Sequence, residues 1–140
     1  MLSGEFRHNL DPKNRIFIPA KHREELGENI MVVYSKRNHC LQVFSKEKWQ
    51  EYIAPLKSMD KRDSERAYRS LHKDALDISP DAQGRIVLSP ALIALAGITK
   101  GAVVVGCGEY AEIWSDERYD ELMADENDEE IVALLESFGL

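Results

Sequence analysis

The chain has 140 residues, 44% of them hydrophobic, which suits one ordinary globular domain or two small modules sharing a core. No apolar run is long enough to span a membrane, and Met1 to Glu5 lacks the basic start of a signal peptide, so we expect a cytoplasmic protein. The formal net charge of −7 argues at first against a nucleic-acid binder, whose surface is usually basic.

The first predicted elements are two short strands joined by a turn. Gly4 to Leu10 alternates residue types as a half-buried strand does, and the apolar run Ile16 to Ile18 predicts a second strand. Between them, Asp11 to Arg15 has the composition of a turn in which the Asp carboxylate accepts from backbone N–H groups. Asn14 tolerates a positive φ, so we expect a left-handed residue directly before Arg15.

A short helix and a hairpin are predicted next. Pro19 suits the first helical turn and Gly27 suits a C-terminal cap. The apolar runs Ile30 to Tyr34 and Leu41 to Phe44 then predict a β-hairpin. Ser45 follows directly and is a typical N-cap residue for another helix.

The same order of elements returns at an offset of 70 residues without a gap. The equivalent residues include Asp11 and Asp81, Asn14 and Gly84, Arg15 and Arg85, Gly27 and Gly97, Phe44 and Trp114, and Ser45 and Ser115. Self-similarity at a fixed offset indicates an internal repeat, here produced by gene duplication. Because Asn14 and Gly84 both tolerate positive φ, the repeat predicts the same turn shape in both copies.

The repeat divides the chain into four expected segments. These are a first module over residues 1–58, a charged helical linker over 59–73, a second module over 74–124 and an acidic, amphipathic C-terminal helix over 125–140. In the last segment Ile131, Leu134, Leu135 and Phe138 fall on one helical face. Neither module has enough apolar residues for a core of its own, so we expect an α+β fold, rich in β, whose copies pair their strands around a common core with pseudo-twofold symmetry.

The charge is divided unequally between the two halves. Residues 1–73 contain 15 Lys and Arg against 10 Asp and Glu, whereas residues 74–140 contain 3 against 15. Such asymmetry is expected when a basic half faces a polyanion and an acidic half turns away from it. A surface that is merely dipolar is the alternative.

Residues that could support catalysis or metal binding form no recognisable pattern. Cys40 and Cys107 are far apart and are expected to be buried thiols. The four histidines, His8, His22, His39 and His72, lack metal-ligand spacing. Gly106-Cys107-Gly108 has the first two glycines of a dinucleotide fingerprint without the third, so we interpret it as a hairpin loop. We therefore expect no catalytic residue, cofactor or metal site, and no enzyme.

The repeated Asp-x-x-x-Arg turn is the strongest candidate site. A planar guanidinium can bond the O6 and N7 atoms of guanine together, or clamp a phosphate. Taken alone, the pattern is also typical of an exposed ion pair, worth at most about 1 kcal/mol. The nearby cations that could contact phosphates are Lys13, Arg7, Lys21, Arg23, Lys36 and Arg37.

The sequence resembles the MraZ family of bacterial transcriptional regulators, whose modules are similar to the AbrB/SpoVT swapped-hairpin β-barrel. The matching segments are Gly4 to Asp11, Asn14 to Lys21 with Arg23-Glu24, and Asp81 with Gly84 to Leu88. The resemblance covers about residues 3–138. It implies a barrel-like core, ring-like homo-oligomers and nucleoid-associated binding to G-rich direct repeats of double-stranded DNA upstream of the division and cell-wall gene cluster.

Carried over to this chain, the resemblance implies that Arg15 and Arg85 read bases or phosphates, with Lys13 and Arg7 as supporting cations. Asn14, Asp11 and Asp81 complete the expected DNA-binding set. The chain departs from the family pattern where Asn14 replaces a glycine, Gln83 a lysine and Ser89 a proline. Because the second turn itself carries no lysine, we expect the first copy to dominate DNA affinity.

Two other classes of function remain open on the sequence. An enzyme would require that Arg15→Ala and Arg85→Ala abolish turnover without affecting DNA binding. A protein-interaction or antitoxin-like module would bind its partner through apolar surface. Salt distinguishes that module from a DNA binder, since binding through several Lys and Arg weakens steeply as salt rises.

Overall fold

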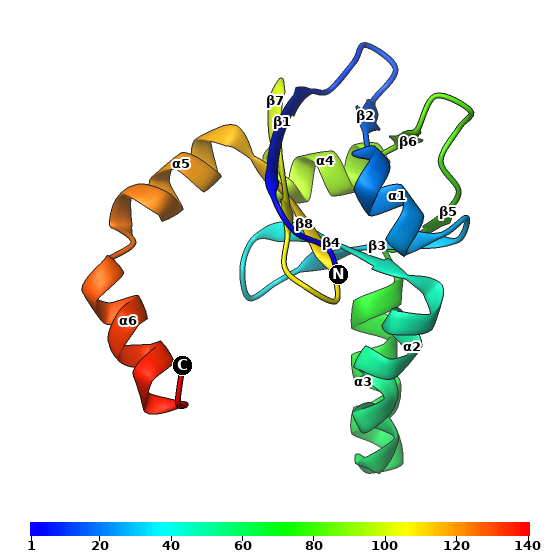
Figure 1. The fold of residues 1–140 in the computed structure, drawn as a ribbon. Helices are drawn as coiled ribbons and strands as arrows, with labels where there is room; N and C mark the ends of the chain where they lie inside the picture. The colour runs from blue at the N-terminus through cyan, green and yellow to red at the C-terminus, as the bar shows by residue number, and fades with distance from the viewer.

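A computed structural model describes all residues, 1–140, as an α+β protein with an extended C-terminal arm (Figure 1). In chain order its elements are β1 (Glu5–Asn9), β2 (Arg15–Phe17), α1 (Ala20–Leu26), β3 (Ile30–Ser35), β4 (Cys40–Ser45), α2 (Lys46–Ile53), the 3-10 helix η1 (Ala54–Ser58), α3 (Lys61–His72), β5 (Leu76–Ile78), β6 (Arg85–Val87), α4 (Pro90–Ala96), β7 (Gly101–Gly106), β8 (Ala111–Ser115), α5 (Asp116–Asp125) and α6 (Asp128–Ser137).

The duplication is visible in the order of the main sheet, β1-β7-β8-β4-β3-β5. All its strand pairs are antiparallel, and the two predicted hairpins, β3–β4 and β7–β8, meet through β4 and β8 at the centre. At each edge the first strand of one copy pairs with the hairpin of the other, β1 with β7 and β5 with β3. The predicted pairing of the copies is therefore confirmed, and it takes the form of strand exchange.

A separate two-stranded ribbon joins the remaining strands, β2 and β6. Its register places Arg15 opposite Val87, Ile16 opposite Ile86 and Phe17 opposite Arg85. Two further bonds extend the ribbon at its ends: the N–H of Ile18 donates to Gly84 O at 2.9 Å, and the N–H of Leu88 donates to Asn14 O at 2.8 Å. The two turns are thus held by each other's strands.

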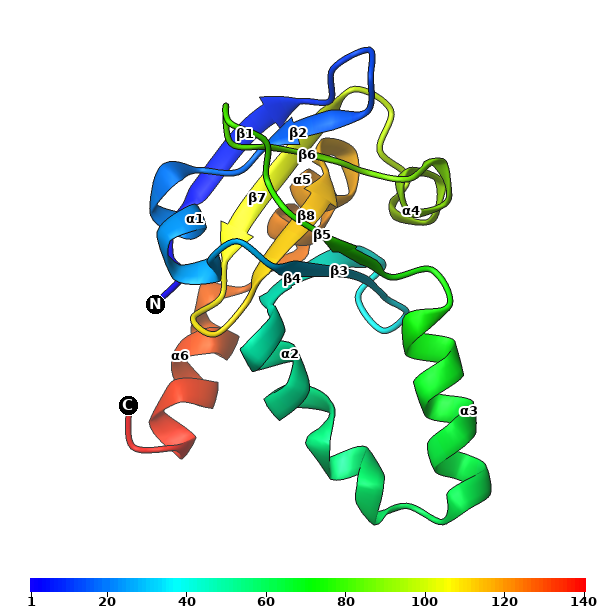
Figure 2. The same ribbon diagram turned by 90° about the vertical axis from the view of Figure 1, so that its right-hand side faces the viewer.

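The main sheet is open, which differs from the barrel-like core expected from the resemblance. The edge strands β1 and β5 do not pair with each other. The ribbon of β2 and β6, together with α1 and α4, covers one face of the sheet, so apolar residues on that face are buried without a closed ring of hydrogen bonds (Figure 2).

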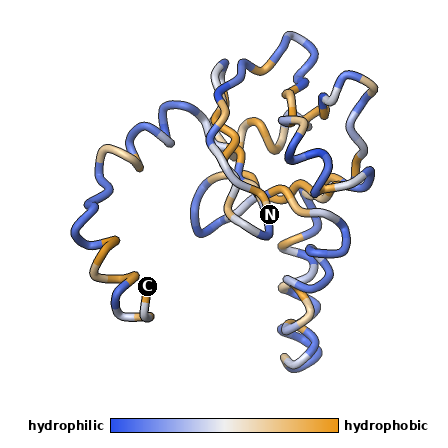
Figure 3. The backbone as a smooth tube through the Cα atoms, in the orientation of Figure 1, coloured by the Kyte–Doolittle hydropathy of each residue, from blue (hydrophilic) through white to orange (hydrophobic).

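Both copies contribute to the largest core cluster. It contains Ile16 and Ile18 from the first copy with Ile86 and Leu88 from the second, all of them almost completely buried. The other face of the sheet carries two smaller clusters, one beneath α2 and α3 and one beneath α5. Figure 3 shows the hydrophobic residues concentrated in the sheet and hydrophilic residues in the projecting turns. The shared core agrees with the prediction that the two copies pack around one common core.

The helix boundaries follow the predicted caps. Pro19 and Gly27 flank α1, and Gly97 ends α4 in the left-handed conformation. Ser45 accepts from the N–H of Lys48 and Ser115 from the N–H of Arg118, so both serines are N-caps as predicted. The predicted charged linker contains α3, which is preceded by η1.

The expectation that both cysteines are buried is wrong for one of them. Cys40 lies in β4 and is buried, but Cys107 is exposed. Cys107 follows Gly106 in the turn between β7 and β8, outside the strands of the sheet. Partial burial, followed by the charge of Glu112, still raises the pKa of the Cys107 thiol to about 12.

The arm formed by α5 and α6 continues the chain away from the body (Figure 1). α5 contacts β7 and β8, whereas α6 buries none of its residues. No helix in the structure combines the length and apolar composition needed to cross a bilayer. No group of three or more His, Cys, Asp or Glu side chains is placed to hold a metal ion.

Candidate nucleic-acid interface

The first turn is built around the carboxylate of Asp11. Its Oδ1 accepts from the backbone N–H of Lys13 at 2.9 Å and of Arg15 at 2.8 Å. The N–H of Asn14 donates to Asp11 O at 3.0 Å, and the φ of Asn14 is 60°. The predicted left-handed residue before Arg15 is therefore confirmed.

The second turn reproduces this arrangement around Asp81. Its Oδ1 accepts from the N–H groups of Gln83 and Arg85, both at 2.9 Å. Gly84 has a φ of 80° and donates its N–H to Asp81 O at 2.9 Å. The two turns therefore share one backbone shape, as the equivalence of Asn14 and Gly84 predicted.

The second carboxylate oxygen of each Asp holds the arginine of its own turn. Asp11 Oδ2 lies 2.6 Å from Arg15 Nε, and Asp81 Oδ2 lies 2.9 Å from Arg85 Nε. Neither arginine makes a hydrogen bond within the chain through its Nη atoms. Each guanidinium is therefore oriented through Nε while its terminal donors remain available for two acceptors.

These contacts keep both carboxyls ionised. At Asp11, partial burial acts to raise the pKa, but hydrogen bonds from Arg15 and Lys13 outweigh it and lower the pKa. At Asp81 the backbone N–H of Arg85 is the largest influence, and the pKa is also lowered. An ionised Asp is what the orientation of each arginine requires.

The ribbon brings the two arginines to one surface. Side chains alternate between the faces of a strand, and Ile16 and Ile86 point into the core, so Arg15, Phe17, Arg85 and Val87 occupy the outer face. Phe17 is 38% exposed and Val87 56%. Both turns stand at the same end of the molecule in Figures 1 and 2. We call this surface, residues 11–15 and 81–85 with the outer face of β2 and β6, the loop face.

Each copy also brings a basic residue close to the turn of the other. Arg23 of α1 lies so close to the second turn that a Cβ added to Gly84 would be 2.6 Å from its Cζ. Arg23 is fixed there because Nε donates to Ile18 O at 3.1 Å and the guanidinium lies over Phe17. Lys100 lies beside the first turn, where its carbonyl accepts from the N–H of Leu10 at 2.7 Å. The second turn therefore has a neighbouring cation, although none lies within it.

Arg23 is among the cations predicted from the sequence, whereas Lys100 is not. Lys100 lies in the acidic half and has no neighbour that suggests a role. Its one signal is that it is the only lysine after residue 73. Pairing of β1 with β7 brings it to the first turn, because Asn9 lies opposite Gly101.

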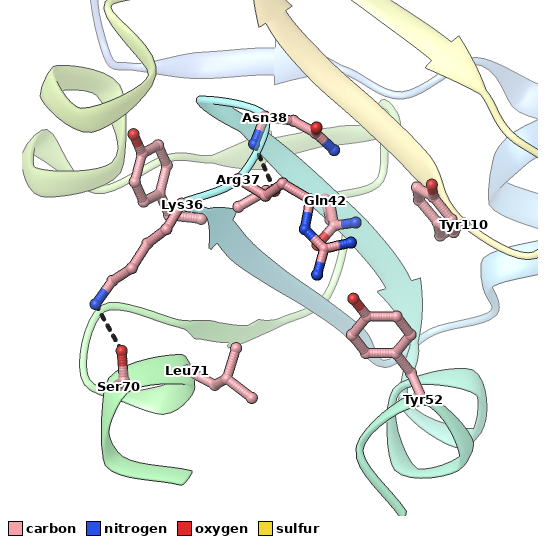
Figure 4. Close-up of a pocket in the computed structure, with 10 residues that line it drawn as sticks. Lys36, Arg37, Asn38, Gln42, Tyr52, Ser70, Leu71 and Tyr110 are labelled. Carbon is pink, nitrogen blue, oxygen red and sulfur yellow. Dashed lines mark hydrogen bonds between the residues drawn. The ribbon is translucent and has the colours of Figure 1, made fainter. Parts of the chain in front are cut away.

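Other predicted cations lie elsewhere. The exposed Lys13 belongs to the first turn and its ammonium has no partner, but Arg7 points to the opposite face of β1, where Nη2 lies 2.8 Å from Asp120 Oδ1. Arg7 also lies over the ring of Tyr119. Lys36 and Arg37 occupy the turn between β3 and β4, beside α3, away from the loop face (Figure 4).

The fold and the loop face define an internally duplicated α+β protein whose strand-exchanged copies present matched arginine turns side by side. The sequence model of one protein family, described as "MraZ protein, putative antitoxin-like", matches the chain twice, over residues 1–70 and 71–135. The chain belongs to the MraZ family.

Several relatives carry the name "Transcriptional regulator MraZ". One from Lachnoclostridium phytofermentans is 36% identical over 100% of this chain and 99% of its own length. One from Lactobacillus helveticus is 36% identical over 92% of this chain and 91% of its own, and one from Thermoanaerobacter sp. is 38% identical over 86% and 85%.

Proposed function

We propose that this chain is a transcriptional regulator that binds double-stranded DNA in a sequence-specific manner through the loop face. The names of its relatives support regulation of transcription. The observation that carries DNA binding is the pair of arginines, Arg15 and Arg85, each held through Nε by an ionised Asp with its terminal donors free. Two adjacent donors on a planar group match O6 and N7 of guanine in the major groove.

The target that best suits this surface is a set of short G-rich direct repeats, as the family resemblance implies for the promoter of the division and cell-wall genes. The Asp11–Arg15 and Asp81–Arg85 pairs cancel in charge, so the excess positive charge comes from Lys13 in the loop face and from Arg23 and Lys100 beside it. One chain therefore makes few phosphate contacts. Strong binding requires several linked copies, whose combined affinity exceeds that of each contact.

We propose in addition that the chain assembles with itself into a ring-like homo-oligomer, so that several loop faces meet regularly spaced repeats. The two copies exchange strands, as the swapped hairpins of AbrB/SpoVT modules do, but the exchanged strands find their partners within one chain. Assembly between chains must then use another surface.

The deciding experiment measures binding of a G-rich repeat duplex by fluorescence anisotropy, with a scrambled duplex of equal length beside it. The variant Arg15→Ala/Arg85→Ala is expected to lose at least about 30-fold in affinity for the repeats, since each of the two bidentate contacts contributes about 1–3 kcal/mol. Arg62→Ala/Arg66→Ala on α3 removes the same charge away from the loop face and should bind nearly as the unmodified chain does. Equal affinity of the double loop variant would exclude the site.

An antitoxin-like protein-binding role is the second candidate, because the description of the family includes those words. The exposed Phe17 and Val87 on the loop face would then contact a protein. Raising the salt concentration separates the two, since DNA binding falls steeply with salt and an apolar protein contact does not.

A further inference from the structure

The last helix, α6, exposes an apolar face that nothing in its own chain covers. Phe138 is 82% exposed and Leu134 59%, and Ile131 and Leu135 lie on the same face. Figure 3 shows this second hydrophobic stretch along the arm, separate from the sheet. A contiguous exposed apolar face of this kind marks a contact surface.

The charge of the arm restricts what can cover that face. Residues 116–140 contain ten Asp and Glu against a single Arg, Arg118. Two arms packed against each other would bring like charges together, which is unfavourable. The partner surface must therefore be basic and must also offer an apolar hollow.

The body of the same chain contains such a surface at the pocket drawn in Figure 4. The pocket has a volume of about 460 Å³ and lies between the β3–β4 turn, α2, α3 and the β7–β8 turn. The rings of Tyr52 and Tyr110 form its apolar part, both packed against Phe44. Gln42 lines it as well, is only 8% exposed, and makes no side-chain hydrogen bond within the chain.

Basic groups surround this pocket. Arg37 lines it and has no ion-pair or hydrogen-bond partner in the chain, and Lys36 beside it donates only to Ser70 Oγ at 2.6 Å. α3 contributes Ser70 and Leu71 to one wall, and Arg69 precedes them in the same helix. The pocket thus combines the positive charge and the apolar hollow that the arm requires.

We propose that the arm of one chain docks on the pocket of a second copy. Phe138 enters between Tyr52 and Tyr110, and carboxylates of the arm pair with Lys36 and Arg37. This inference rests on the self-assembly proposed above and identifies its surfaces. Within one chain α6 buries none of its residues, and Figure 1 shows the arm directed away from the body.

The contact joins two different surfaces, so it is heterologous. Each chain has one arm to donate and one pocket to accept, and the next chain can be added in the same way. Heterologous contacts close into rings when the rotation permits it and otherwise extend as filaments. Docking of the arm therefore accounts for a ring without any symmetric dimer contact.

Mixing two defective variants tests the contact by sedimentation velocity at micromolar concentration. Leu134→Ser/Phe138→Ser damages only the arm, and Lys36→Glu/Arg37→Glu damages only the pocket; all four residues are exposed. Each variant alone is expected to sediment as a monomer of 16.0 kDa. An equimolar mixture should form a species of twice that mass, because one intact arm meets one intact pocket. Ala133→Ser, on the opposite face of α6, should retain the unmodified assembly.

Three results would overturn the contact: an arm variant that assembles normally, a pocket variant that assembles normally, or a mixture that stays monomeric. DNA binding is measured separately on a duplex with one repeat, where the arm variant should bind within about twofold of the unmodified chain. Loss of that binding by the loop variants tests the proposed function alone, and normal binding by a monomeric arm variant supports both proposals independently.

Discussion

In the first turn, Lys13 and Asn14 precede the arginine, whereas the second turn has Gln83 and Gly84 at the same places. The hydrogen bonds that shape the two turns are nevertheless the same, with Asp Oδ1 accepting two backbone N–H groups in each. Backbone shape therefore depends on the Asp and on a residue that tolerates positive φ. The positive charge near each turn is set separately, by Lys13 in one and by Arg23 from the other copy in the second.

The largest expected difference between the two turns is the loss of DNA affinity when the arginine of either one is replaced by alanine. On a duplex with a single repeat, Arg15→Ala is expected to weaken binding by about 10- to 100-fold, as loss of a bidentate base contact does. Arg85→Ala should weaken it less, because Lys13 adds charge only to the first turn. Anisotropy titrations measure both, with Arg62→Ala as the control for charge. An equal or larger loss for Arg85→Ala would show that Arg23 makes the second turn the stronger site.

Exchanging the left-handed residues tests why the turns differ at that position. Gly84→Asn should destabilise the fold by about 1–3 kcal/mol, because its Cβ displaces Arg23 from Ile18 O and Phe17. Asn14→Gly should change stability by less than about 0.5 kcal/mol, since glycine adopts the same φ. Thermal unfolding followed by circular dichroism gives both values. If Arg23→Ala does not relieve the cost of Gly84→Asn, the close approach of Arg23 is not its cause.

Removing the lysine from the first turn, or adding one to the second, tests how the charge of each turn contributes to DNA affinity. Lys13→Gln should lower affinity several-fold and reduce the slope of log K against log salt by about 1, as loss of one phosphate contact does. Gln83→Lys should increase the slope by a similar amount. Titrations of the single-repeat duplex at four salt concentrations provide the measurement. Unchanged slopes for both variants would place residues 13 and 83 outside the DNA contact.

The smallest expected difference concerns pH. The pKa of both Asp carboxyls is lowered in the folded chain, so their stabilisation is present above about pH 4 and is lost as the pH falls through the folded-state pKa. Asp81→Asn should flatten the fall in Tm between pH 5 and pH 3 more than Asp11→Asn does. Burial opposes the lowering of the pKa at both residues, but it is the largest single influence only at Asp11. Parallel Tm curves for Asp81→Asn and the unmodified chain would contradict this order.

Much of the local structure followed from the sequence alone. The repeat at 70 residues, the Asp-held turns, the left-handed Asn14 and Gly84, and the serine N-caps each depend on residues close together in the chain. Such features are encoded locally because short-range hydrogen bonds and allowed φ values decide them. These local features also determine where Arg15 and Arg85 lie within their turns.

Only the tertiary structure decided which of these residues meet. β1 pairs with β7 and β2 with β6, so Lys100 lies beside the first turn and Arg23 beside the second, while Arg7 faces Asp120. The same packing leaves the sheet open and Cys107 exposed, contrary to expectation. Strand exchange satisfies backbone hydrogen bonds between segments far apart in the chain, and no local pattern specifies which partner is chosen.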